Sequence, residues 1–147
     1  MNKETIKFLK DRAIGRLSYW YLASPYSKWD AGQEDAFERA ADYAAILIRR
    51  GIPVFCPIAH SHSIAKIGPL DGLSHELWMT QDWPLVRASC GIIICPMFGW
   101  NESLGVVQEI QWADKLGLPV MLWEYRSDRE VVTQLLPHNL ADYGVML

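Results

Sequence analysis

The distribution of apolar residues divides the chain into short apolar runs and longer segments of helical periodicity. We expect the runs to form five strands, the last of which has the weakest pattern: Leu17–Ala23, Ile52–Cys56, Gly91–Pro96, Leu118–Trp123 and Tyr143–Leu147. Nearly every position in these runs is apolar, which is typical of parallel strands covered on both faces. The sequence therefore predicts a buried parallel sheet.

Between the strands, apolar or small residues recur at intervals of three or four. Four helices are predicted: Gln33–Arg50, Ser74–Ser89 with an interruption at Pro84, Leu104–Leu116 and, with a weaker pattern, Asp128–Leu136. Proline interrupts a helix because it cannot donate a hydrogen bond to the preceding turn. The segment Pro57–Leu73 has mixed polarity and is predicted to be a long loop that serves as a lid or a specificity loop.

Strands that alternate with helices indicate an α/β architecture. We expect residues 1–147 to form a single doubly wound domain of the flavodoxin or Rossmann type, with about five parallel strands, helices on both faces and residues 1–16 as a helical extension. In such sheets, ligands bind beyond the carboxyl ends of the strands. The candidate site residues therefore follow a strand or stand at the start of a helix: Ser24, Tyr26, His60, Asp82, Ser103 and Glu109.

Composition narrows the classes of partner. The 147 residues have a formal net charge of −3 and no basic stripe of the kind that binds duplex nucleic acid. No apolar run approaches the roughly 20 residues of a membrane helix, and the N-terminus lacks the apolar core of a signal peptide. Three irregularly spaced cysteines fit a reducing compartment. We therefore expect a cytoplasmic protein with no membrane partner and no duplex nucleic-acid partner.

The stretch Ser103–Glu109 is the most informative part of the chain. Ser103 can cap the helix that follows, and the free N–H groups at a helix N-terminus attract an anion. Gly105 lies one turn before Glu109, so the carboxylate has an open approach. A glutamate at such a spacing is commonly a surface residue, but the apolar neighbours of Glu109 place it beside the buried face of the helix. This combination predicts a ligand that has both a phosphate and an electrophilic carbon.

Asp82 is a second candidate carboxylate. An aspartate just before a proline often only caps a helix, and taken alone Asp82 favours that structural role. If Asp82 instead faces Glu109 across a cleft, the two groups can share one proton, so that one is ionised while the other is protonated. One ionised and one protonated carboxyl group are what cleavage of a glycosidic bond requires.

The first strand leads into the segment Tyr21–Ser27, whose hydroxyl groups can bind a ligand. No segment of the chain has the glycine-rich fingerprint of dinucleotide binding or a Walker-type phosphate loop. The pair His60 and His62 lacks the third ligand that catalytic zinc needs, so we expect no metal and no cofactor. For His60 a hydrogen-bonding role in the loop is favoured, with recognition of a base as the alternative.

Together these residues resemble the nucleoside 2-deoxyribosyltransferase superfamily, and within it the deoxynucleoside 5′-monophosphate N-glycosidases. The resemblance lies in Tyr21–Tyr26, in the helix that contains Asp82, and in Ser103-Leu104-Gly105-Val106-x-x-Glu109. The chain also resembles a bacterial and phage branch of that superfamily with a Gly-Trp-x-x-Ser motif, here Gly99–Ser103. The similarity spans roughly Leu17 to Trp123.

The resemblance implies a role for each matching residue. Glu109 would be the nucleophile that attacks the anomeric carbon, Asp82 the proton donor to the leaving base, and Tyr26 the residue that orients the glutamate. The residues that would contact the substrate are Ser24, Ser103, Gly105, His60 and Tyr21. Where Ser103 stands, the transferases usually have an acidic residue for a free 5′-hydroxyl, and a serine instead suits a 5′-phosphate. Members of this superfamily are commonly homodimers or larger, so we expect a homo-oligomer.

Three hypotheses follow from the sequence. The first is an enzyme that cleaves the N-glycosidic bond of a nucleotide, with transfer of the sugar to a second base as a variant of the same chemistry. The second is a nucleotide-binding or sensing module without turnover. The third is an interaction protein that uses some of its seven tryptophans on an exposed surface.

Overall fold

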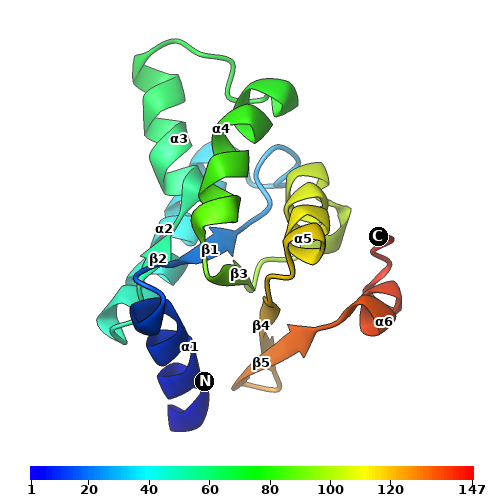
Figure 1. The fold of residues 1–147 in the computed structure, drawn as a ribbon. Helices are drawn as coiled ribbons and strands as arrows, with labels where there is room; N and C mark the ends of the chain where they lie inside the picture. Colours follow the sequence, from blue (N-terminus) through cyan, green and yellow to red (C-terminus); the bar gives the residue numbers. More distant parts are fainter.

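Five strands form one sheet in the order β2-β1-β3-β4-β5 (Figure 1). All 147 residues are described by a computed structural model. The strands are β1 (Trp20–Ala23), β2 (Val54–Phe55), β3 (Gly91–Ile94), β4 (Val120–Arg126) and β5 (Arg129–Leu135). β1 to β4 are parallel, and β5 pairs with β4 in the antiparallel direction. This strand order is that of flavodoxin-like folds, so the predicted doubly wound α/β class is confirmed.

Six α-helices surround the sheet: α1 (Lys3–Gly15), α2 (Gln33–Arg49), α3 (Pro57–Ile67), α4 (His75–Ala88), α5 (Leu104–Leu116) and α6 (Pro137–Leu140). Two short 3₁₀ turns, η1 (Trp100–Glu102) and η2 (Ala141–Tyr143), complete the structure. The predicted helices at 33–50, 74–89 and 104–116 are confirmed to within a residue or two at each end. α4 continues through Pro84, whereas the sequence predicted an interruption there.

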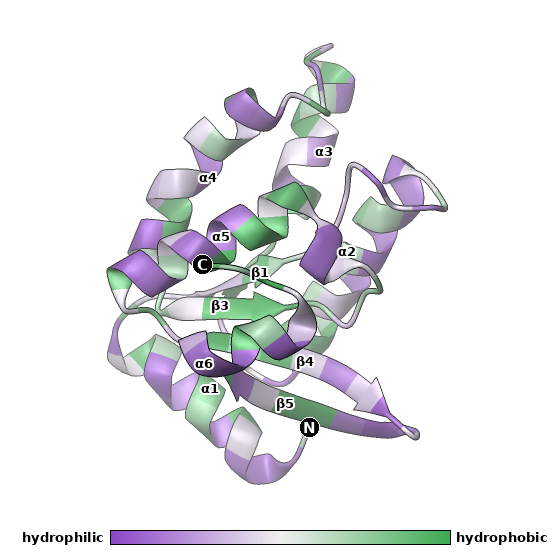
Figure 2. Ribbon diagram, turned by 90° about the vertical axis from the view of Figure 1, so that its right-hand side faces the viewer, coloured by the Kyte–Doolittle hydropathy of each residue, from purple (hydrophilic) through white to green (hydrophobic).

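Successive residues of the central strands supply two separate hydrophobic cores. Trp20 and Leu22 of β1 pack with residues of α1 and α2 on one face of the sheet, and Tyr21 and Ala23 pack with residues of α4 and α5 on the other. The central strands are accordingly hydrophobic at successive positions, while the outer sides of the helices are hydrophilic (Figure 2). The predicted N-terminal helix is therefore part of the domain core rather than an appendage, because Leu9 and Ala13 of α1 are fully buried.

Two predicted elements have a different secondary structure. Pro57–Leu73 was predicted to be a loop, but its first eleven residues form α3, with Pro57 in the first turn, where a missing N–H has no cost. Asp128–Leu136 was predicted to be a helix, but residues 129–135 form β5. Ser127 and Asp128 have positive φ values and make a tight turn, and the β-branched residues that follow favour a strand.

The predicted strand Tyr143–Leu147 is also wrong. The chain there leaves η2 without pairing to the sheet, and Val145 alone is buried, against the core on the α5 side. The fifth strand of the sheet is instead β5, which occupies the edge next to β4.

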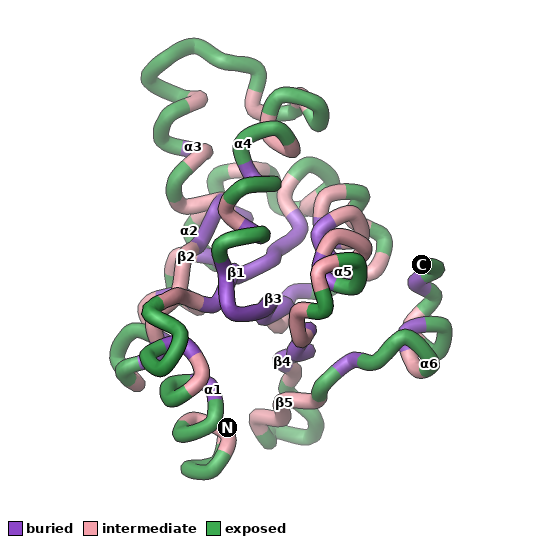
Figure 3. The backbone as a smooth tube through the Cα atoms, in the orientation of Figure 1, coloured by how far each residue is buried: buried purple, intermediate pink, exposed green.

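α3 and α4 extend beyond the sheet and are joined by an exposed connection at the end of the molecule opposite α1 (Figures 1 and 3). The central strands below them are buried. β1 lies between β2 and β3, so the direction of winding reverses at the carboxyl ends of β1 and β3. No helix is sufficiently long and apolar to span a lipid bilayer.

Candidate active site

A cavity of about 170 Å³ lies beyond the carboxyl end of β1, between α3, α4 and α5. Six of the eight residues that the sequence predicted as a site line this cavity: Ser24, Tyr26, Asp82, Ser103, Gly105 and Glu109. They come from three elements that are separate in sequence, namely the segment after β1, the middle of α4 and the first turns of α5. The fold therefore brings the predicted residues to one place.

Glu109 is a buried carboxyl group in the second turn of α5, with 5% of its surface exposed. The hydroxyl of Tyr21, on the neighbouring strand β1, donates a hydrogen bond to its Oε1 atom at 2.7 Å. Burial and the charge of Asp82 together raise the pKa of Glu109 to about 8, although the bond from Tyr21 acts in the opposite direction. The surface role that such a glutamate commonly has is thereby excluded.

Asp82 is also buried, with 8% of its surface exposed, and it lies inside α4. Ser74 caps that helix by accepting a hydrogen bond from the amide of Leu77, so Asp82 is not an N-cap. Burial raises the pKa of Asp82 to about 6, and the hydroxyl of Tyr21 again opposes the shift. The cavity wall thus contains two carboxyl groups whose pKa values are both displaced toward neutrality.

Tyr21 connects the two carboxyl groups. Burial, followed by the nearby charges of Glu109 and Asp82, raises the pKa of Tyr21 well above its usual value, so this hydroxyl keeps its proton and acts as a donor. The sequence assigned the orientation of Glu109 to Tyr26, and that assignment is wrong in its geometry. Successive residues of a strand point to opposite faces, and Tyr21 is on the face that α4 and α5 cover.

Tyr26 lines the cavity but has different partners. Its hydroxyl lies 2.8 Å from Nδ1 of His62, and Nε2 of the same ring lies 3.0 Å from Oε2 of Glu34. The ring of Phe37 stacks on the imidazole at a centroid distance of 4.6 Å. His62, which is 9% exposed, therefore holds Tyr26 in place at the cavity wall.

His60 was predicted to contact the substrate, and the structure places it elsewhere. It is exposed on α3, does not line the cavity, and has its ring 5.6 Å from that of Phe55. Two residues along a helix correspond to a rotation of about 200°. His62 consequently faces Tyr26 and α2, whereas His60 is directed toward Phe55.

The remaining lining groups are suited to an anion. Ser24 Oγ is buried and has no hydrogen-bond partner, which is costly unless a ligand satisfies it. Ser103 caps α5 by accepting a bond from the amide of Val106, so the positive end of the α5 dipole faces the cavity. Gly105 leaves this approach open, since a methyl group there would meet only Met79 and Ser103, at 3.8 and 4.0 Å.

No group of three or more histidine, cysteine, aspartate or glutamate side chains is arranged to hold a metal ion.

Comparison with known proteins identifies a family for this chain. A search of curated proteins found no match to this chain. The model of the family described as "Domain of unknown function (DUF1937)" matches residues 18–125, a span that contains β1, Asp82 and Glu109. Because the match covers well over half of the sequence, the chain belongs to the DUF1937 family.

Proposed function

We propose that the protein cleaves the N-glycosidic bond of a (deoxy)nucleoside 5′-monophosphate, and that it is related to the nucleoside 2-deoxyribosyltransferase superfamily that its motifs resemble. The observation that carries the proposal is the pair of buried carboxyl groups, Asp82 and Glu109, that line one cavity and both interact with the Tyr21 hydroxyl. Most enzymes that cleave glycosidic bonds use such a pair of carboxyl groups.

In the first step, the ionised carboxylate of Glu109 attacks C1′ of the sugar. The bond between C1′ and the base nitrogen breaks, its electron pair goes to the base, and Asp82 supplies a proton to the base. In the second step, Asp82 takes a proton from a water molecule, which attacks C1′ and releases Glu109 and the sugar phosphate. The covalent ester divides one difficult displacement into two easier ones.

The raised pKa values of Asp82 and Glu109 support a mechanism in which the two carboxyl groups share one proton. Between pH 6 and pH 8 the two carboxyl groups together hold one proton, which in the free protein resides on Glu109, the group with the higher pKa. The reaction needs the proton on Asp82. Positive charge that develops on the sugar beside Glu109 favours the ionised form of that residue and so moves the proton to Asp82.

The 5′-phosphate is proposed to lie at the N-terminus of α5. Ser24 and Ser103 supply hydroxyl groups there, and the helix dipole favours negative charge. An acidic residue in place of Ser103 would repel a phosphate. This difference favours hydrolysis of nucleotides over base exchange between nucleosides.

The proposal is tested by incubating the purified protein with a panel of ribo- and deoxyribonucleoside 5′-monophosphates and measuring free base. Glu109→Gln is expected to abolish release, and Asp82→Asn to slow it roughly 10²- to 10⁴-fold, as for loss of a general acid. Asp114→Asn, which removes an exposed carboxylate from the same helix, is the matched control.

If wild type releases no base while nucleotides raise its melting temperature, the hypothesis of a sensing module replaces that of an enzyme. Exchange that exceeds hydrolysis when a second base is added identifies a transferase.

We also propose that the protein acts as a homo-oligomer in the cytoplasm. Leu73 and Leu104 stand at the cavity and are 54% and 64% exposed, and Leu77 lies nearby on α4, which supports a neighbouring subunit at the mouth. All three cysteines are free thiols, which suits a reducing compartment. Light scattering coupled to size-exclusion chromatography tests the oligomeric state, and a monomer at all concentrations would reject it.

A further inference from the structure

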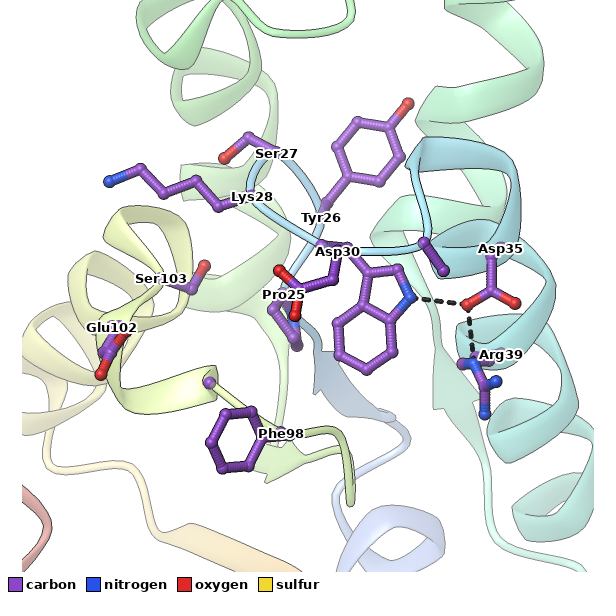
Figure 4. A pocket seen from close by; sticks show the side chains of 13 residues that line it. Pro25, Tyr26, Ser27, Lys28, Asp30, Asp35, Arg39, Phe98, Glu102 and Ser103 are labelled. Atoms are coloured by element: carbon purple, nitrogen blue, oxygen red, sulfur yellow. Dashed lines mark hydrogen bonds and ion pairs between the residues drawn. The ribbon is translucent and has the colours of Figure 1, made fainter.

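A second cavity of about 220 Å³ adjoins the first (Figure 4). Both cavities are lined by Tyr26, Ser27 and Ser103, whereas Asp82 and Glu109 line only the first. We call the first the carboxylate chamber and the second the outer chamber. A group bound at Ser27 and Ser103 lies at the boundary between the two chambers, and Ser103 is also one of the two serines to which the proposed function assigns the phosphate.

The outer chamber is lined on one side by a fixed group of side chains. Arg39 and the indole N–H of Trp29 both bond to Oδ2 of Asp35, at 2.7 and 2.6 Å, and the guanidinium lies over the Trp29 ring. In this network the charge of Arg39 balances that of Asp35, and the ring of Trp29 is held in a fixed position. It leaves the chamber with a defined shape on that side.

The other charged groups of the outer chamber form no ion pair. Lys28 extends toward the start of α5, above Ser103, whereas Asp30 and Glu102 lie on either side of the space below it (Figure 4). Lys28 is thus placed to meet a phosphate at the boundary. The carboxylates of Asp30 and Glu102 are placed to accept hydrogen bonds from hydroxyl or amino groups further out.

Phe98 is the most unusual residue of this chamber. Its side chain is 91% exposed on the loop after β3, and it packs against no other aromatic ring. An exposed phenylalanine at the mouth of a polar cavity offers a flat face to a planar ligand, and stacking of a nucleobase on such a ring is favourable whatever the base.

The sizes of the chambers indicate a ligand that occupies both. Small-molecule sites generally have volumes of about 300–1,000 Å³. The chambers, at about 170 and 220 Å³, are each below that range, and together they fall within it.

We propose that the substrate is a dinucleotide, in which the 5′-phosphate of the reacting nucleoside is linked to a second nucleoside. The reacting nucleoside occupies the carboxylate chamber, the linking phosphate lies at Ser27, Ser103 and Lys28, and the second base stacks on Phe98. Asp30 and Glu102 accept hydrogen bonds from the second sugar or base. This inference rests on the proposed function and specifies its substrate class.

Charge supports the linked phosphate over a free one. A terminal phosphate carries a charge of about −1.5 to −2 at neutral pH, and a phosphodiester carries one negative charge. Lys28 is the cation of the outer chamber that forms no ion pair, and it can balance one negative charge. The carboxylates of Asp30 and Glu102 would repel the additional negative charge of a terminal phosphate.

The test measures dissociation constants with the Glu109→Gln protein, which cannot turn the ligand over. The probes are the four deoxynucleoside 5′-monophosphates, the four homodinucleoside phosphodiesters and diadenosine pyrophosphate, the last of which separates a pyrophosphate linker from a diester. We expect at least tenfold tighter binding of one dinucleotide than of its mononucleotide. Phe98→Ala should remove that preference and leave the mononucleotide constant unchanged. Leu17→Ala, at a 95% exposed apolar residue remote from both chambers, is the control.

Equal affinities for dinucleotides and mononucleotides, or no binding of any dinucleotide, would overturn the inference. So would a Phe98→Ala variant that weakens both ligand classes by the same factor. Base release by wild type from mononucleotides without a dinucleotide preference rejects the dinucleotide alone. A preference that Phe98→Ala removes, without base release from any probe, rejects the proposed chemistry and leaves the outer chamber as a binding site.

Discussion

At the residue scale, the proposed chemistry depends on two carboxyl groups whose pKa values straddle neutral pH. Burial raises the pKa of Asp82 to about 6, and burial together with the charge of Asp82 raises the pKa of Glu109 to about 8. Below pH 6 both groups are protonated, so no nucleophile is present. Above pH 8 both are ionised, so no proton donor is present.

This order of titration predicts a bell-shaped dependence of kcat/KM on pH, with its maximum between about 6 and 8. In Tyr21→Phe, the alkaline limb should move to higher pH, because the hydrogen bond that lowers the pKa of Glu109 is lost. Initial rates of base release across pH 5–10 measure both effects. A profile that rises steadily with pH, or an alkaline limb that moves downward, would contradict the shared proton.

The burial of Glu109 also predicts a pH-dependent cost in stability. Its pKa is raised from 4.5 to about 8, so as pH rises through this interval the unfolded chain releases a proton that the folded protein retains, and stability falls. Glu109→Gln removes the titration and keeps an acceptor for Tyr21. We expect the variant to exceed wild type in stability by about 2–4 kcal/mol at pH 9. The difference should vanish near pH 4.

Urea denaturation of both proteins at pH 4, 6, 8 and 9 measures this difference. Asp114→Asn, at an exposed position of the same helix, should show no comparable dependence on pH. If the stability advantage of Glu109→Gln over wild type grew as pH fell, it would have the wrong sign for a buried carboxyl group with a raised pKa.

At the same scale, the sequence identified the chemical groups better than their partners. Glu109 was predictable because a carboxylate beside an apolar helix face needs a partner or a function, whereas Asp82 was assigned its role by the family resemblance. The role of Tyr21 depends on which face of β1 it occupies, and a strand that is buried on both faces has no polar alternation to reveal it. The choice between His60 and His62 required knowledge that α3 is helical.

At the scale of elements, the first turn of α5 determines how a ligand approaches Glu109. Gly105→Ala introduces a methyl group with ordinary contacts to Met79 and Ser103, so the protein should fold. Alanine favours the helix over glycine by up to about 1 kcal/mol. The same methyl group reduces the space over the carboxylate, and we therefore expect weaker binding of nucleotides together with unchanged or slightly higher stability.

Calorimetric titration and thermal unfolding of Gly105→Ala separate the two effects. The control is Gly15→Ala in α1, where a methyl group would meet nothing within 4 Å and where the residue lines neither chamber. Loss of affinity in both variants, or a Gly105→Ala protein that fails to fold, would show that the glycine has a structural purpose.

The elements that the sequence mispredicted share a physical cause. α3, β5 and the C-terminal segment all lie at the periphery of the sheet, where periodicity is weak because fewer side chains are buried. Local signals existed in two of them. Pro57 stands in the first turn of a helix, and Val131 and Val132 follow the turn at Ser127 and Asp128. The central strands and α2, α4 and α5 were predictable because their burial imposes a strong pattern.

At the scale of the whole molecule, one polar cluster ties together three parts of the chain that are distant in sequence. Glu130 of β5 accepts hydrogen bonds from Arg50, which follows α2, and from the N-terminal ammonium that precedes α1. This cluster joins the edge of the sheet to the two helices that cover one face. The carboxylate chamber, beyond the carboxyl end of β1, is lined by no residue of this cluster, so the cluster can be altered without changing the site.

Burial alone would raise the pKa of Glu130, but the bonds from Arg50 and the N-terminal ammonium outweigh it and lower the pKa below its usual value. A lowered carboxyl pKa means that the stabilisation is present above the unfolded value of about 4.5 and is lost as pH falls through the folded pKa. Relative to wild type, the free energy of unfolding of Glu130→Gln should therefore be lower by about 1–3 kcal/mol at pH 7 and almost unchanged at pH 3. Thermal and urea unfolding at these two pH values measure the loss. Base release per folded molecule should stay at the wild-type rate, and a fall in that rate would mean that the sheet edge and the carboxylate chamber are coupled across the domain.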